Sequence, residues 1–109
     1  MLRGDVVSIA DRKGQFTSKP RPAVIVQSDF FAEANTVVVC PISTASVDAP
    51  LVRFEIEPSD TLPLQHNSWI EVDMITTVRR SRVGKRIGRI ADADLIRLNG
   101  ALAVFLGLG

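Results

Sequence analysis

The chain has 109 residues, of which 46% are hydrophobic and 23% are charged, and its formal net charge is +1 at pH 7. This composition is typical of one globular domain and argues against a disordered tail or a linker protein, while so small a total charge gives no information about nucleic acid. The longest apolar run, residues 101–106, is too short to span a bilayer, and the one cysteine, Cys40, excludes an internal disulfide and suits a reducing compartment, so we expect a single cytoplasmic domain over residues 1–109.

The first two predicted strands flank a polar, basic segment. Asp5–Ala10 reads as a strand, and its acidic first residue precedes any apolar segment of the kind a secretory signal needs. Pro22–Gln27 is a run of β-branched residues, which predicts a buried strand. Between them, Asp11–Arg21 is longer than a tight hairpin turn requires, and loops of this kind often carry function.

A short helical turn and a third strand follow. Ser28 and Asp29 are good capping residues, so we expect a helical turn over Phe30–Ala34. Thr36–Ile42 reads as another core strand. Pro41 indicates that this strand finishes there, because a proline cannot donate a hydrogen bond to a sheet ladder.

The second half of the chain predicts short strands and one terminal helix. Leu51–Ile56 alternates as an edge strand does, and Glu57–Asn67, with two prolines, reads as a loop. Further short strands are expected at Ser68–Val72, Thr76–Arg80 and Arg86–Ile90. Asp92 is a good N-cap for a final helix, and four apolar residues then share one helical face: Leu95, Leu98, Leu102 and Phe105.

This order of elements predicts a mainly β fold with short helices, of the α+β class. Many short strands in succession favour a small curled antiparallel sheet or a small barrel, and the single helix at the end of the chain packs against it.

Basic and acidic residues are segregated along the chain. Six basic residues and no acidic one fall between Arg79 and Arg89, and a second acid-free stretch runs from Arg12 to Arg21. Such segregation favours a phosphate-binding surface, although solvated loop charges produce the same pattern.

The remaining residue types limit the possible chemistry. One histidine, His66, and one cysteine cannot form a His/Cys metal cluster within one chain, and no phosphate-binding P-loop is present. A Ser–His–Asp triad stays open, but His66 has no nucleophile-elbow motif beside it. Arginines, hydroxyls and carboxylates suffice for metal-free cleavage of RNA by its own 2′-hydroxyl, because the substrate then carries the nucleophile.

Four segments in order resemble the MazF/PemK toxin family, also called Kid-like. They are Arg3–Val7, Lys19–Val26, Val37–Thr44 and Val72–Ile90, and the terminal helix is similar as well. The resemblance implies an SH3-like barrel of the CcdB/MazF type that forms a homodimer. It also implies the toxin of a type II toxin–antitoxin system, a sequence-specific endoribonuclease of the mRNA interferase type that needs no metal or cofactor. Such enzymes cleave single-stranded RNA to leave 2′,3′-cyclic phosphate and 5′-hydroxyl ends.

The resemblance implies three catalytic residues. Arg21, in the family's R-P-A-V motif, is implied to stabilise the transition-state charge and to take part in proton transfer. Ser43 stands where the family usually has threonine and keeps the hydroxyl. Asp73 matches an acid/base aspartate of the Kid branch, but Glu71 and Lys13–Gln15 replace that branch's arginine and histidine. Each of the three residues also has a purely structural alternative. Arg21 would be a surface arginine, Ser43 a serine that caps the backbone, and Asp73 an aspartate that forms a turn.

Further residues are implied to bind the substrate. The loop beside the RNA groove supplies Gln15, Phe16 and Lys19, and the other candidates are Thr44, Arg79, Arg80, Arg82 and Lys85. Phe16 stacks on a base or anchors its loop, and the basic residues line the groove or solvate a hairpin. Trp69 and the pair Phe30–Phe31 are assigned to core or dimer contacts, and Cys40 to an inert buried position.

Two other functions remain open at this point. A CcdB-like gyrase poison would share the fold without catalysis, although Leu106–Gly109 lacks the terminal aromatic residue that such proteins use. An RNA-binding module without cleavage is the other. The family resemblance further implies an antitoxin partner, whose acidic, partly disordered tail folds into the basic groove over Arg21.

Overall fold

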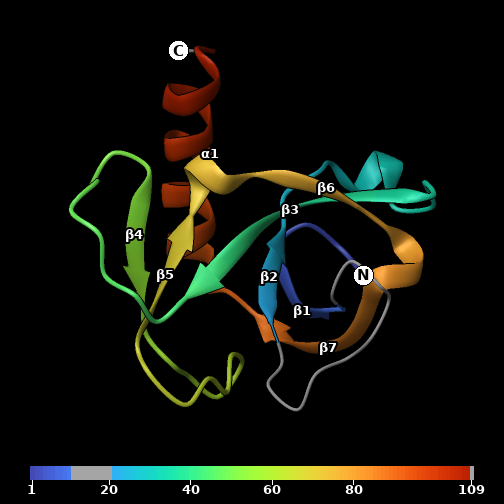
Figure 1. Cartoon of the computed structure of the whole chain (residues 1–109), viewed down its shortest axis with the longest axis horizontal. Coiled ribbons are helices and arrows are strands. Elements are labelled where there is room, and N and C mark those ends of the chain that lie inside the picture. Colours follow the sequence, from blue (N-terminus) through green and yellow to red (C-terminus); the bar gives the residue numbers. More distant parts are fainter. Residues whose placement is uncertain (11–20, 109) are drawn as a thin grey trace.

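The structure is a computed structural model that describes residues 1–10 and 21–108. Within these ranges the chain forms seven strands, three short 3-10 turns and one C-terminal helix (Figure 1). The strands are β1 (Asp5–Ile9), β2 (Pro22–Ile25), β3 (Thr36–Ser43), β4 (Arg53–Ile56), β5 (Ser68–Glu71), β6 (Thr76–Arg79) and β7 (Val83–Arg89). The turns are η1 (Asp29–Phe31), η2 (Val72–Met74) and η3 (Arg80–Arg82), and the helix is α1 (Asp92–Leu106). Every predicted strand is therefore present, and its ends either coincide with the prediction or are shifted by at most three residues.

All the strand pairs are antiparallel, and the sheet curls around its own axis. The strand order is β4-β5-β3-β2-β1-β7, and β6 pairs with β3 outside this path. Because the pairing path does not close among the described residues, the structure is the curled sheet rather than the closed barrel of the two predicted forms. No helix in the described part of the chain is long and apolar enough to cross a membrane.

β3 is the longest strand and changes its partner along its length. Thr36–Val39 pair with β6, whereas Ile42 and Ser43 pair with β5. Pro41 falls between these two pairings, so its missing N–H lies at the change of partner. The prediction that the strand finishes at Pro41 is therefore wrong, since β3 continues to Ser43.

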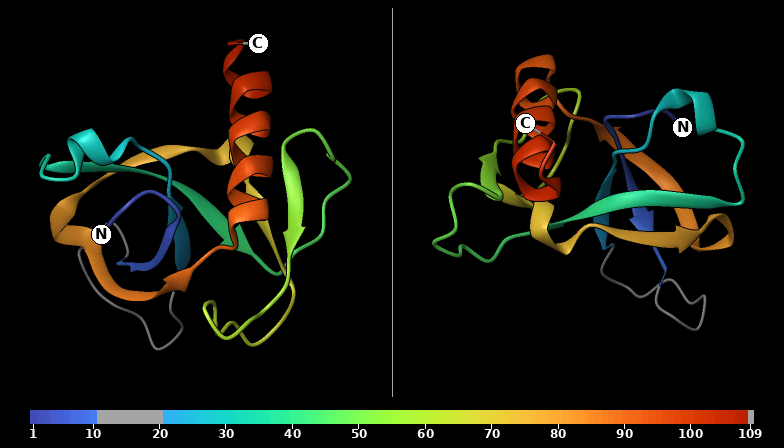
Figure 2. Two further views of the ribbon diagram at one scale, coloured as in Figure 1. Left: turned by 180° about the vertical axis from the view of Figure 1, so that it is seen from behind. Right: turned by 90° about the horizontal axis from the view of Figure 1, so that it is seen from above.

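Two hydrophobic clusters lie on opposite faces of the curled sheet. The smaller cluster lies within the curl and consists of Val7, Ala23, Ile25, Val37, Val39 and Val78. The larger one lies between the sheet and α1 and includes Val24, Cys40, Ile42, Phe54, Ile70, Leu98 and Leu102. Figure 2 shows α1 outside the curl, beside β4 and β5. Alternate side chains of β3 therefore enter alternate clusters, as the two-residue period of a strand requires.

The helix differs from its prediction at both ends. Its N-cap is Ala91, and Asp92 lies in the first turn, where a carboxylate still interacts favourably with the helix dipole. Leu98 and Leu102 are buried as predicted, but Phe105 is 43% exposed, because α1 extends past the sheet at this end (Figure 1). Gly107 ends the helix with φ 72°, a left-handed conformation that glycine adopts without strain.

The segment 57–67 is a loop, as predicted, and it packs on β7. The Arg89 N–H donates to the Thr61 carbonyl at 2.8 Å. A Cβ at Gly88 would lie 2.3 Å from that same oxygen, so only glycine allows so close an approach. The loop thereby ties the β4–β5 hairpin to the curled sheet.

Three aromatic side chains, predicted to make core or dimer contacts, lie outside the core of the described chain. Ser28 caps η1, as expected, by accepting a hydrogen bond from the Phe30 N–H, but Phe30 and Phe31 are 87% and 56% exposed. They form an edge-to-face pair with ring centroids 5.1 Å apart. Trp69 is half-buried on the outer face of β5. Of the two predicted positions for Phe30 and Phe31, the core is therefore wrong, because η1 lies at the surface, and the dimer contact stays a prediction.

Candidate active site

Arg21 and Ser43 lie at the same end of the β2–β3 ladder. The last pair of that ladder is Ala23–Pro41, and each candidate lies two residues beyond it. The carbonyl of Arg21 accepts a hydrogen bond from the Ile9 N–H at 2.9 Å, so the backbone there still continues the ladder with β1. The Arg21 side chain is exposed and Ser43 is half-buried. The sheet thus brings together a guanidinium and a hydroxyl, which are groups that bind phosphate oxygens.

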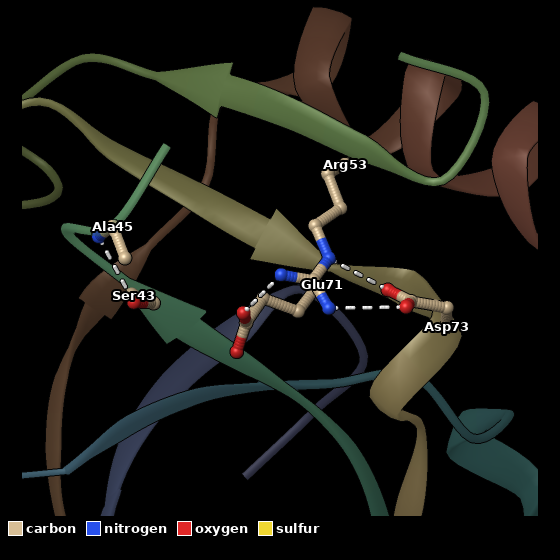
Figure 3. Close-up of polar contacts among 5 residues, drawn as sticks. All are labelled: Ser43, Ala45, Arg53, Glu71 and Asp73. Atoms are coloured by element: carbon tan, nitrogen blue, oxygen red, sulfur yellow. Dashed lines mark hydrogen bonds and ion pairs between the residues drawn. The ribbon is translucent and has the colours of Figure 1, made fainter. Parts of the chain in front are cut away.

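The Ser43 hydroxyl also has a local structural contact. Its oxygen accepts a hydrogen bond from the Ala45 N–H at 3.0 Å, which closes a turn directly after β3 (Figure 3). A hydroxyl that accepts one hydrogen bond still has its own O–H to donate. Capping the backbone and donating to a substrate are therefore compatible, and the neighbouring Thr44 is exposed at the same place.

One face of the β3–β5–β4 sheet is partly exposed to solvent, and we call it the open face. The register places Ser43, Trp69 and Glu55 in one row across the three strands. In the next row Glu71 lies opposite Arg53, and Pro41 shares this face because it is two residues from Ser43. The reverse face of the same three strands carries buried Ile42, Ile70 and Phe54. The open face consists of Pro41, Ser43, Arg53, Glu55, Trp69 and Glu71.

Arg53 holds two carboxylates at the edge of the open face (Figure 3). Its Nε and Nη2 groups donate to the two Asp73 carboxylate oxygens at 2.9 and 3.0 Å, and its Nη1 donates to Glu71 Oε2 at 2.9 Å. The Arg53 guanidinium holds the pKa of Asp73 below its ordinary value, and Asp73 in turn raises the pKa of Arg53. The cluster is therefore ionised at neutral pH, with one cation and two anions.

This pairing bears on the predicted acid/base role of Asp73. A carboxyl group with a lowered pKa has no proton to donate at neutral pH and is a weak base. Trp69 is the cross-strand neighbour of Ser43, and Asp73 follows Trp69 by four residues. Asp73 therefore lies at the end of the open face that is away from Ser43. Arg53 is separated from Glu71 and Asp73 by 18 and 20 residues, so nothing in the linear sequence singles it out. The outward position of Arg53 in a predicted edge strand was the only available signal.

The basic run predicted to bind substrate does not form one surface. Arg79 pairs with Thr36, the first residue of β3, whereas Ser43 is the last residue of that strand. Thr36 and Ser43 are seven residues apart, which corresponds to roughly 23 Å along the strand. Arg80 binds the carbonyls of Ala34 and Ala32, and Arg82 binds the Ala10 carbonyl at 2.8 Å.

Of the four residues of this run predicted to bind substrate, two are exposed: Arg79 and Lys85. Lys85 is in β7, next to β1, and its N–H donates to Ser8 Oγ at 3.1 Å. Ser8 pairs with Pro22, so Lys85 lies one strand away from the Arg21 end of β2. Three other predicted substrate-binding residues lie outside the described residues: Gln15, Phe16 and Lys19.

Two further ionisable groups belong to the interior of the fold. Cys40 is fully buried, and burial raises the pKa of its thiol to about 12, as expected for an inert residue. Burial also raises the pKa of Asp5, but hydrogen bonds from the Leu2 N–H and Arg89, with the charge of Arg86, bring it below its ordinary value. The Asp5 carboxylate lies 3.2 Å from Arg89 and 3.3 Å from Arg86.

The sequence matches a known family over almost its whole length. Residues 2–106 match the model of the family described as PemK-like, MazF-like toxin of type II toxin-antitoxin system. A protein of Mycolicibacterium smegmatis named probable endoribonuclease MazF is 44% identical over 99% of this chain and 98% of its own length. An endoribonuclease MazF of Staphylococcus saprophyticus is 27% identical over 99% of this chain and 92% of its own. These matches confirm the predicted resemblance.

The fold is similar to solved structures of the same kind. A mycobacterial endoribonuclease in complex with its cognate antitoxin superimposes with a TM-score of 0.79 and 25% identity, covering 100% of this chain and 97% of the other. A MazE–MazF complex from Deinococcus radiodurans superimposes with a TM-score of 0.74 over 100% and 97% of the two chains. At 19% identity the second similarity bears on the fold alone. The predicted fold is confirmed.

Proposed function

Because the chain belongs to the family of PemK-like, MazF-like toxins of type II toxin–antitoxin systems, we propose that it is an endoribonuclease that cleaves single-stranded RNA without a metal ion. Cleavage is sequence-specific, takes place in the cytoplasm and proceeds by attack of the RNA 2′-hydroxyl on the adjacent phosphorus. The products carry 2′,3′-cyclic phosphate and 5′-hydroxyl ends. The name of the relative that is 44% identical supports the activity.

The observation that carries this proposal is the position of Arg21 and Ser43. Both lie at one end of the β2–β3 ladder, on backbone that the sheet holds in place. Groups fixed in advance around a developing charge accelerate a reaction more than mobile ones, because they need not reorganise when the charge forms. This arrangement suits a reaction in which the substrate supplies its own nucleophile.

The two side chains have distinct proposed roles. Arg21 donates in a fork to two phosphate oxygens and stabilises the negative charge that grows as the 2′-oxygen attacks; it also takes part in proton transfer. The Ser43 O–H donates to a phosphate oxygen while its oxygen keeps the hydrogen bond from Ala45. Asp73 remains a candidate acid/base, although its pairing with Arg53 favours a carboxylate that orients other groups.

The decisive experiment is RNA cleavage in the presence of EDTA. Purified protein and an Arg21→Ala variant are incubated with a long single-stranded RNA, and the ends of the fragments are analysed. We expect discrete fragments with cyclic-phosphate ends from the wild type and a rate at least about 10³-fold lower for the variant, since it loses a charged donor to the transition state. Arg21→Lys keeps the charge but not the fork, so its rate should lie between the two.

The alternatives predict different results. An RNA-binding module leaves the RNA intact in both proteins while binding is retained. A gyrase poison of the same fold neither binds nor cleaves RNA over a wide range of sequences and doses. Either outcome would overturn the proposed activity.

We also propose that the protein is a homodimer and is inhibited by an antitoxin. The similarity to an endoribonuclease in complex with its cognate antitoxin supports a partner of this kind. The acidic, partly disordered tail of the antitoxin folds over Arg21 and the exposed basic residues. Its affinity should fall steeply with salt, because charge screening weakens such contacts. An affinity that does not change between low and high salt contradicts this mode of inhibition.

A further inference from the structure

Trp69 has a position that neither hydrophobic cluster explains. It is the only tryptophan of the chain. It lies on the open face of β5, half-buried, while its neighbours Ser68 and Ile70 point to the buried side. Its side chain belongs to neither buried cluster of the described residues. A large, partly exposed ring in this position is available to stack on a ligand.

The register places this ring beside the proposed catalytic hydroxyl. Trp69 is the direct cross-strand partner of Ser43, so their Cα atoms lie about 5 Å apart. Side chains of paired residues stand on the same face of a sheet and touch their neighbours. A phosphate held by Ser43 and Arg21 therefore brings its own nucleotide over Trp69.

The charges around the ring favour a base there and disfavour a phosphate. Glu55 lies opposite Trp69 on β4, and Glu71 follows it by two residues on β5. Asp73 adds a third carboxylate, and Arg53 is the cation that pairs with Glu71 and Asp73. Three anions and one cation repel a phosphate group but accept hydrogen bonds from the amino and imino groups of a nucleobase edge.

Arg53 also keeps this surface rigid. Its side chain is only 14% exposed, and one of its hydrogen bonds goes to Glu71, two residues from the ring, while the other two go to Asp73. A ring with a fixed neighbour loses less conformational entropy when a base stacks on it.

We propose that Trp69 is a substrate-binding residue that stacks on the RNA base adjoining the cleaved phosphate, on the side of Ser43 away from Arg21. This inference rests on the proposed endoribonuclease function. The RNA backbone then follows Arg21 and Ser43, and one base turns onto the open face. Stacking of a base on an aromatic ring contributes about 1–3 kcal/mol in alanine substitutions, which corresponds to about 5- to 150-fold in affinity.

The single tryptophan allows a direct test. Intrinsic tryptophan fluorescence is followed while 2′-O-methyl RNA is added, because this RNA lacks the nucleophile and binds without being cleaved. Binding is measured independently by the anisotropy of a labelled copy of the same RNA. We expect saturable quenching of the emission at the concentrations where anisotropy rises. Ser43→Ala should still show quenching at saturation, but at a higher RNA concentration, since it loses one phosphate contact and keeps the ring.

Substitutions test the contribution to cleavage. Trp69→Leu should lower kcat/KM by about 10- to 100-fold, and Trp69→Phe should restore most of the loss because it retains a ring. Phe30→Leu is the matched control, since Phe30 is an exposed aromatic residue on η1 and outside the open face. It should cleave at the wild-type rate. Thermal unfolding of each variant establishes that it is folded at the assay temperature.

The outcomes separate this inference from the proposed function. Wild-type cleavage with unchanged emission at saturating RNA, or a folded Trp69→Leu variant with wild-type kcat/KM, overturns the stacking role alone. Emission that changes with protein concentration and not with RNA places the ring in a contact between protein copies and also overturns it. If the wild type neither binds nor cleaves RNA, the proposed function and this inference fail together.

Discussion

The two ends of β3 lie in different environments although they belong to one strand. Near its start, Val37 and Val39 point into the small cluster inside the curl. Near its end, Ser43 occupies the same face of the strand but is half-buried, because β5 has replaced β6 as the neighbour and the curl no longer covers that face. A strand fixed by a core at one end can therefore hold a polar site rigidly at the other.

The arginines of the two regions make different contacts. At the curled end, Arg80 and Arg82 bind backbone carbonyls and so hold chain segments together. On the open face, Arg53 binds two carboxylates and leaves the cluster with a net negative charge. The contacts at the curled end contribute to stability, whereas a recognition role for the open face belongs to the proposal for Trp69.

The largest effect that distinguishes the two ends is expected at Ser43. Ser43→Ala should lower kcat for RNA cleavage by about 30-fold, since a hydrogen bond made in the transition state contributes about 2 kcal/mol. Ser43→Thr keeps the hydroxyl and should retain at least the wild-type rate. Single-turnover cleavage of a defined RNA measures both. A Ser43→Ala rate equal to the wild type would remove Ser43 from the catalytic group.

A smaller effect, on stability, is expected at the curled end. Arg80→Met should lower the free energy of unfolding by about 1.5 kcal/mol, because the carbonyls of Ala32 and Ala34 lose a charged donor, and this should lower Tm by about 8 °C. Arg79→Met is the matched control, since Arg79 is exposed, and should change Tm by less than about 3 °C. Thermal unfolding followed by circular dichroism measures both. An unchanged Tm with a raised KM for Arg80→Met would instead assign this residue to substrate binding.

The smallest expected effect is a pH dependence that originates at Asp5. Its pKa is lower in the folded chain than in the unfolded chain, where it is about 3.9. The stabilisation by the ionised Asp5 is therefore complete at pH values above the pKa of the unfolded chain. It is lost as the pH falls through the pKa of the folded chain. Asp5→Asn should cost about 1 kcal/mol at pH 7, since both partner arginines are partly exposed, and this difference should shrink below about pH 4. Denaturant unfolding at pH 7 and pH 3 tests it; an equal difference at both pH values would contradict the role of charge.

Local sequence patterns predicted most of the fold, because the strands lie where apolar and β-branched residues are concentrated. The run Thr36–Ile42 is rich in β-branched, apolar residues, which favour a strand, and all of it after Thr36 is buried or half-buried. The prediction was wrong at Pro41 because the effect of a proline depends on which neighbour faces its missing N–H, and that neighbour is set by the change from β6 to β5. It was wrong at Phe105 because the length of the helix beyond the sheet is a tertiary property.

Less of the candidate site than of the fold could be predicted from the sequence. Arg21 and Ser43 are each identified by a local motif, and the sheet places them at the same end of two paired strands. The charge run 79–89 gave no sign that Arg80 and Arg82 bind carbonyls at residues 32, 34 and 10, because those partners are distant in the chain. The same holds for the contacts of Arg53 with Glu71 and Asp73. Side-chain partners between strands follow from the register, which local patterns do not specify.

The buried thiol of Cys40 has a consequence for the signals to which this protein responds. Oxidants and disulfide exchange act on the thiolate, and with a pKa of about 12 only on the order of one thiol in 10⁵ is ionised at pH 7. The side chain is also fully enclosed by the core. While the chain is folded, its one cysteine is therefore a poor target for oxidants and for disulfide exchange.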